Sequence, residues 1–169
     1  SFELYEGEIT SLIGPNGAGK TTFFDLITRF QTSDSGSIFL NEKNVTKLNS
    51  YRLARLGMVR TFQLTRVFDR MSVYENMKFA GSSLKNEGFL KSLIQTKTLK
   101  QQEDQLDLKI DETLKLLNLI EMKDSYAREL SGGQKKLLEL GRSLMKNPKI
   151  LLLDEPLAGV NPKLSEELL

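Results

Sequence analysis

Residues 14–21 decide the fold of this chain, and they have the sequence Gly14-Pro15-Asn16-Gly17-Ala18-Gly19-Lys20-Thr21. This run fits the pattern G-x-x-x-x-G-K-[ST], in which glycines let backbone N–H groups approach a phosphate without a Cβ in the way. A helix predicted over Thr21–Phe30 would place its positive dipole end on the same anion. An ordinary turn before a helix is the alternative. The strand predicted over Glu8–Ile13 favours a phosphate loop, because such loops join a strand to a helix.

The side chains at the end of the loop have the chemistry that a nucleotide needs. Lys20 can reach the β and γ phosphates, Thr21 can bind Mg²⁺, and Thr22 adds a second hydroxyl. The predicted nucleotide-binding set of this region is Gly14, Pro15, Asn16, Gly17, Ala18, Gly19, Lys20, Thr21 and Thr22.

A second motif joins a buried strand to two carboxylates. Ile150–Leu153 is wholly apolar, as expected for a strand in a parallel sheet, and Asp154 and Glu155 follow it directly. In open α/β sheets, ligands lie beyond the carboxyl ends of the strands. We therefore expect Asp154 to hold Mg²⁺ through water and Glu155 to polarise the attacking water. On this motif alone, a surface Asp-Glu pair is an equally good interpretation, and the loop at 14–21 favours the functional one.

Two further features are weaker. A helix predicted over Ser131–Asn147 begins with Ser131-Gly132-Gly133-Gln134, which is either a second anion-binding helix start or a plain capped one. Gln63 follows a strand predicted over Met58–Phe62, and its amide can contact Mg²⁺ or water. By itself, Gln63 is equally compatible with an ordinary polar loop position.

Composition excludes several kinds of chemistry. The 169 residues include no His and no Cys, which removes His-containing triads, thiolate nucleophiles and zinc sites with these ligands. A general base must then be a carboxylate, Lys or Tyr. The net charge of +2 is too small to indicate nucleic acid as a partner. The polar stretch 91–105 predicts a loose connection or an exposed helix, ahead of apolar residues at helical spacing over Glu103–Glu121.

Taken together, the motifs resemble an ABC-type ATPase domain in their order and spacing, over essentially the whole chain. The run Leu130-Ser131-Gly132-Gly133-Gln134 is specific to that superfamily and distinguishes it from other phosphate-loop proteins. Three stretches look like the ATP-binding subunits of branched-chain amino acid importers, although related lipid-export ATPases share much of them. These stretches are residues 55–63, 71–77 and 158–162.

The resemblance implies an α/β fold of the P-loop NTPase class. We expect one ABC ATPase domain over 1–169, with a parallel sheet and a helical subdomain inserted at 71–147. The family also has an adenine-stacking aromatic well before the loop and a switch histidine after the Asp-Glu pair, and neither lies within this sequence. We therefore expect a domain truncated at both ends, whose 169 residues hydrolyse ATP poorly by themselves.

The resemblance also implies roles for particular residues, with ATP and Mg²⁺ as the cofactors. Glu155, Gln63 and Lys20 would be catalytic, and Thr21, Gln63 and Asp154 would hold Mg²⁺. Ser131, Gly132, Gly133 and Gln134 would act on ATP bound by a second ATPase subunit, in a head-to-tail dimer of like or unlike copies.

The implied function is ATP hydrolysis that powers uptake of branched-chain or related hydrophobic amino acids. The partners would be integral membrane permease subunits, without nucleic acid, at the cytoplasmic face of the plasma (inner) membrane. In such systems the permease and the binding protein choose the substrate. The alternatives are a lipid-export ATPase, an ABC ATPase that works on DNA or ribosomes, and a nucleotide-binding module that no longer hydrolyses ATP.

Overall fold

The structure is a computed structural model that describes residues 2–61, 67–82 and 96–154, without the side chains of residues 96–99. The chain divides into two compact units, Ser1–Leu53 and Ala54–Leu169. The predicted boundaries of the helical subdomain, 71 and 147, stay a prediction.

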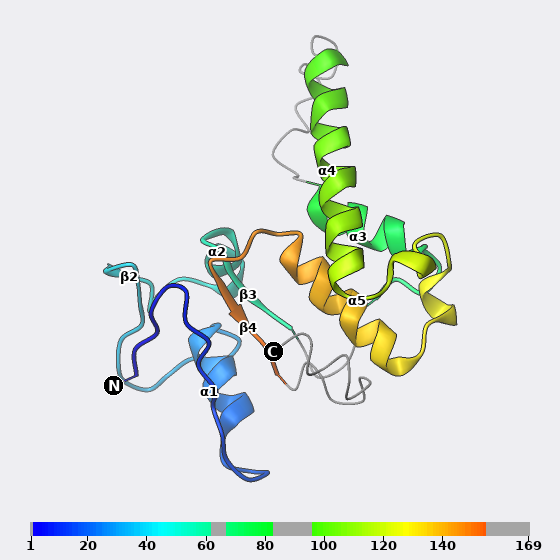
Figure 1. Cartoon of the computed structure of the whole chain (residues 1–169). Coiled ribbons are helices and arrows are strands. Elements are labelled where there is room, and N and C mark those ends of the chain that lie inside the picture. The colour runs from blue at the N-terminus through cyan, green and yellow to red at the C-terminus, as the bar shows by residue number, and fades with distance from the viewer. Residues whose placement is uncertain (1, 62–66, 83–95, 155–169) are drawn as a thin grey trace. The chain divides into compact units, whose positions relative to one another are not determined.

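The first unit contains helix α1 (Lys20–Ile27) and a small hairpin of β1 (Phe39–Leu40) and β2 (Lys43–Asn44) (Figure 1). The two residues between the strands, Asn41 and Glu42, both have positive φ, of 47° and 62°. This is the conformation of a two-residue type I′ turn, whose twist matches that of a hairpin.

The helix predicted over Thr21–Phe30 is confirmed as α1, although α1 begins one residue earlier and ends at Ile27.

The strand predicted over Glu8–Ile13 is wrong, because the structure places these residues in no helix or strand. Ile9 and Ile13 are 87% and 91% exposed. A strand is stabilised by backbone hydrogen bonds to a neighbouring strand and by burial of its apolar face. The described part of the chain supplies neither to this segment, so a content of apolar and β-branched residues alone does not form a strand.

Helix α2 (Ser50–Arg55) crosses the boundary between the units, and every element after it in the chain belongs to the second unit. Its α-helices are α3 (Val73–Gly81), α4 (Thr96–Leu116) and α5 (Gly132–Leu144). Its remaining elements are the 3₁₀ turns η2 (Ile120–Met122) and η3 (Ala127–Glu129) and the strands β3 (Met58–Arg60) and β4 (Ile150–Leu152).

Strands β3 and β4 pair in parallel, with Met58 opposite Ile150, Val59 opposite Leu151 and Arg60 opposite Leu152. Parallel neighbours far apart in sequence require a long crossover, and here it contains α3, α4 and α5 (Figure 1). The predicted combination of a parallel sheet and helices is confirmed.

The core of the second unit lies where α3, α4 and α5 meet. The predicted helical stripe contributes Ile110 and Leu114 from α4 and Leu117 directly after it, all fully buried. On α5 an alanine at Gly141 would bring its Cβ within 2.9 Å of a Leu117 methyl, so this glycine permits close helix packing. The buried core consists of Val73, Met77, Ile110, Leu114, Leu117, Leu119, Ala127, Leu130, Leu137, Leu138 and Met145.

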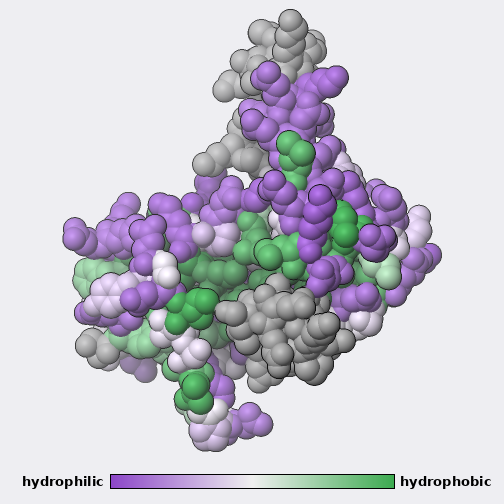
Figure 2. All heavy atoms as spheres, viewed as in Figure 1, coloured by the Kyte–Doolittle hydropathy of each residue, from purple (hydrophilic) through white to green (hydrophobic). Residues whose placement is uncertain are grey.

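The polar stretch predicted over 91–105 contains the start of α4, which begins at Thr96. Of its two interpretations, a helix is therefore correct from that residue onward, and residues 100–105 of this helix are exposed. Figure 2 shows α4 covered mainly by hydrophilic side chains on the face in view. Across the described ranges, no helix is both long and apolar enough to span a bilayer.

Candidate functional site

The predicted phosphate loop contains two glycines in a conformation that other residues rarely adopt. Gly17 and Gly19 have φ of +83° and +86°. A Cβ built on either would contact nothing within 4 Å, so the requirement for glycine comes from the backbone and not from crowding. The amide of Ala18 donates to the carbonyl of Pro15 at 3.2 Å and closes the turn between them. The loop is therefore folded and open on its outer side.

The ammonium group of Lys20 lies against this loop. Its Nζ donates to the carbonyl oxygens of Gly14 at 2.6 Å and Pro15 at 3.0 Å. Both acceptors are neutral, so the positive charge of Lys20 is not cancelled by either of them. A cation held beside exposed backbone amides attracts an anion to the loop.

The loop leads directly into α1, and the start of this helix has no side-chain cap. Gly19 is the N-cap residue, and it has no side chain that could accept a hydrogen bond from the first amides of the helix. Such N–H groups require an acceptor, and a phosphate supplies one while interacting favourably with the helix dipole. Thr21 and Thr22, in the first turn, are exposed. This arrangement fits the phosphate groups of a nucleotide.

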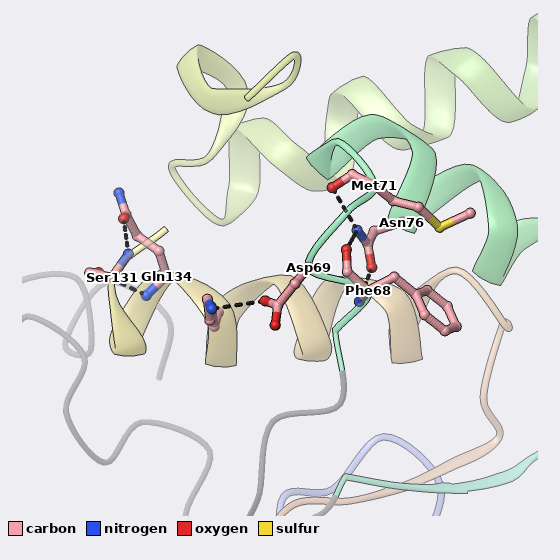
Figure 3. A network of polar contacts seen from close by, with 7 residues as sticks. Phe68, Asp69, Met71, Asn76, Ser131 and Gln134 are labelled. Atoms are coloured by element: carbon pink, nitrogen blue, oxygen red, sulfur yellow. Dashed lines mark hydrogen bonds and ion pairs between the residues drawn. The ribbon is translucent and has the colours of Figure 1, made fainter. Parts of the chain in front are cut away.

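The start of α5 is different, because its own side chains cap it. The Ser131 hydroxyl accepts a hydrogen bond from the amide of Gln134 at 3.3 Å, and the Gln134 side chain accepts one from the amide of Ser131 at 2.8 Å (Figure 3). This reciprocal pair is a capping box, and Ser72 and Glu75 form another at the start of α3. The capped-start interpretation is therefore confirmed, while an action of Ser131–Gln134 on ATP stays a prediction.

Asp154 lies two residues beyond the end of β4, because this strand ends at Leu152, one residue earlier than predicted, and Asp154 is 8% exposed. Its carboxylate Oδ2 lies 3.4 Å from a guanidinium nitrogen of Arg60, at the end of β3. Its backbone amide donates to the hydroxyl of Thr61 at 3.4 Å. The end of β4 is thus joined to the end of β3 by side chains as well as by the backbone ladder.

The sequence interpretation missed Arg60, although one observation pointed to it. Arg60 follows two buried residues in β3, and a charge that ends an apolar strand needs a partner of opposite sign. The spacing between 60 and 154 does not reveal that partner, since only the parallel register brings the two strand ends together.

Asn76 was also missed. It is fully buried on α3, and its amide oxygen accepts a hydrogen bond from the amide of Phe68 at 2.9 Å. Its amide nitrogen donates to the carbonyl oxygens of Phe68 and Met71, which Figure 3 shows, and to that of Ser72. One side chain thereby fixes the segment that precedes α3. An ion pair of 2.9 Å between Asp69 and Lys135 joins the same segment to α5.

Two predicted site residues, Gln63 and Glu155, lie outside the described residues. The remaining predicted residues fall into separate groups: the loop and the start of α1 in the first unit, and Asp154 and the start of α5 in the second.

Comparison with known proteins gives consistent matches. A family model described as ABC transporter matches residues 1–158. The probable branched-chain amino acid transport ATP-binding protein LivG of Archaeoglobus fulgidus is 42% identical over 164 residues, which are 97% of this chain and 63% of that protein. The high-affinity branched-chain amino acid transport ATP-binding protein LivG of Salmonella typhimurium is 40% identical over 168 residues, with 99% and 66% covered.

A solved structure agrees with these matches. The ADP conformation of MJ1267, described as an ATP-binding cassette of an ABC transporter, has a TM-score of 0.73 and 40% identity to this chain. The match covers 96% of this chain and 63% of that one. The predicted fold class is thereby confirmed. The chain spans slightly less than two thirds of the length of these relatives.

Proposed function

The chain belongs to the ABC transporter family, as its resemblance predicted, and from this premise we propose that it binds and hydrolyses ATP to power uptake of branched-chain amino acids. The observation that carries the proposal is the geometry of residues 14–20. These residues contain two left-handed glycines, a helix start without a side-chain cap and the Lys20 ammonium. Together they match the shape and charge of a polyphosphate.

Each predicted site residue has its own role in the proposed reaction. Lys20 balances charge on the terminal phosphates, and the amides of the loop donate to their oxygens. Thr21 and Gln63 would supply oxygen ligands of the kind that Mg²⁺ prefers, and Asp154 would hold the cation through water. Glu155 accepts a proton from the attacking water, a task that falls to a carboxylate in a chain without His. When bound, Mg²⁺ neutralises charge on the β and γ phosphates.

The start of α5 acts on a second copy. In this proposal Ser131–Gln134 contact the ATP held by the phosphate loop of another ATPase subunit, like or unlike, in a head-to-tail dimer. Support comes from the location of Ser131 and Gln134 at a helix start, where backbone amides point outward. Gly132 gives further support, because among the described residues no atom other than those of its chain neighbours and its own helix backbone lies within 4 Å of where its Cβ would be, which leaves this helix start open to a ligand.

The transport function rests on the relatives, which are described as branched-chain amino acid transport proteins. Integral membrane permease subunits would then hold this chain at the cytoplasmic face of the plasma (inner) membrane. The net charge of +2 gives no basis for a nucleic-acid partner.

Uptake measurements in cells test this function. Deleting the gene that encodes this chain should reduce uptake of radiolabelled leucine, isoleucine and valine, and the intact gene should restore it. A Lys20→Ala copy should fail to restore uptake because its loop has lost the phosphate-binding charge. Normal uptake in the deletion strain would contradict the proposed substrate, and full rescue by Lys20→Ala would contradict the proposed use of ATP.

A further inference from the structure

Arg60 and Asp154 meet because of the register of the parallel strands. Arg60 lies opposite Leu152, so their side chains share one face of the sheet. Asp154 is two residues beyond Leu152, and its 3.4 Å distance to Arg60 places its carboxylate on the side of the chain where the guanidinium lies. A long arginine side chain on β3 therefore reaches a short aspartate beyond the end of β4.

Both side chains are withdrawn from water. The exposed fraction is 5% for the side chain of Arg60 and 7% for that of Asp154. A buried carboxylate is unfavourable unless a positive charge or several hydrogen bonds compensate it. The Arg60 guanidinium provides that charge, at 3.4 Å from Oδ2.

The backbone keeps the two residues together. The amide of Thr61 donates to the carbonyl of Leu152 at 3.0 Å, which extends the β3–β4 ladder by one hydrogen bond. The Thr61 hydroxyl in turn accepts the amide of Asp154. The ion pair is therefore a feature of the sheet edge and not a chance encounter between two surface side chains.

We propose that Arg60 is a positioning residue that serves as the counter-ion of Asp154 before Mg²⁺ arrives, so that the cation must bind against an arginine charge. This inference rests on the proposed function, in which Asp154 supports Mg²⁺. A guanidinium that close both holds the carboxylate in place and repels a second cation. Arg60 thereby raises the Mg²⁺ concentration that the nucleotide site requires.

The test is a Mg²⁺ titration of the full chain at a fixed concentration of the fluorescent nucleotide MANT-ATP, with fluorescence as the readout of binding. Arg60→Gln keeps a hydrogen-bond donor but removes the charge. It should lower the half-saturating Mg²⁺ concentration by roughly tenfold. Arg60→Lys, which keeps the charge, should stay near the unmodified value.

Two controls separate the possible failures. Arg142→Gln removes another partly buried guanidinium, which lies 4.6 Å from the centre of the Phe68 ring, and should leave the Mg²⁺ dependence unchanged. Asp154→Asn should raise the half-saturating Mg²⁺ concentration. If Asp154→Asn shifts the titration and Arg60→Gln does not, the role of Arg60 is overturned while that of Asp154 stands. If neither shifts it, Asp154 is not a Mg²⁺ ligand and the proposed function loses that residue.

A structural measurement on the unmodified chain covers the case in which Arg60→Gln does not fold. A crystal structure with Mg²⁺ and ADP should show the Arg60 guanidinium displaced from Asp154. An unchanged pair, with the cation held by Asp154 at the same time, would overturn the inference.

Discussion

At the scale of single residues, glycine conformation and one lysine define the predicted phosphate loop. Gly19 has φ of +86° and open space around its missing Cβ. Gly36, in the same unit, has φ of +95° and equally open space, but it lies in no predicted motif. Both glycines have the left-handed backbone conformation, but only Gly19 has a proposed role in binding phosphate. Gly36 is therefore a matched control for Gly19.

Alanine at either glycine should lower stability by about 1–2 kcal/mol, because a Cβ is strained in the left-handed region. Only Gly19→Ala should also weaken ATP binding, by about tenfold or more, since it moves the amides that contact phosphate. Urea unfolding and calorimetric titration with ATP measure the two effects. Equal ATP affinity in the two variants would show that the loop does not bind phosphate.

Asn76 has a structural role that can be tested in the same manner. Asn76→Asp keeps the acceptor for the Phe68 amide but places a carboxylate against three carbonyl oxygens in a fully buried site. We expect a loss of about 3 kcal/mol or more in the free energy of unfolding.

Asn44→Asp is the control for this change. Asn44 is exposed, and its side-chain oxygen accepts the amide of Thr46 at 3.0 Å, a contact that aspartate preserves. The free energy of unfolding should change by less than about 0.5 kcal/mol. A similar loss in both variants in urea unfolding would argue against a special role for Asn76.

The sequence was informative about residues whose role is local. The loop glycines and the N-cap Ser131 were predictable because short-range patterns determine their conformation. Arg60 and Asn76 were not, because their partners are set by strand register and by the packing of α3 on the segment before it.

At the scale of elements, the start of α5 repeats the start of α3. Ser131 with Gln134 and Ser72 with Glu75 both form complete capping boxes. The two helices therefore gain similar stability from similar hydrogen bonds, although only α5 carries the predicted ATP-contacting residues.

Ser131→Ala and Ser72→Ala should each cost about 1 kcal/mol in the free energy of unfolding, since each removes one cap. Only Ser131→Ala should weaken ATP-dependent dimerisation, measured by sedimentation. If both variants dimerise like the unmodified chain, then Ser131 is a cap and nothing more.

The elements also show where periodicity is a reliable guide. The apolar stripe of α4 predicted a helix and its buried face, because each side chain of the stripe packs in one core. The strand over Glu8–Ile13 failed, since a strand depends on a neighbour that the pattern itself does not specify.

At the scale of the whole molecule, the residues of the proposed site are divided between two units. The first unit contains the predicted phosphate loop, and the second contains Asp154 and the start of α5. The family match spans both units, from residue 1 to residue 158. This match over both units, more than any single motif, is the reason for proposing that the separate groups serve one nucleotide-dependent cycle.

The measurement that tests the central claim most directly is the molar mass of the Glu155→Gln variant by light scattering, with and without Mg²⁺ and ATP. We expect a monomer without nucleotide and a dimer that retains ATP when Mg²⁺ and ATP are added, because binding is intact and the base is missing. Lys20→Ala in the same background should remain monomeric. A Glu155→Gln variant that hydrolyses ATP at the unmodified rate, or stays monomeric with ATP, would contradict the account.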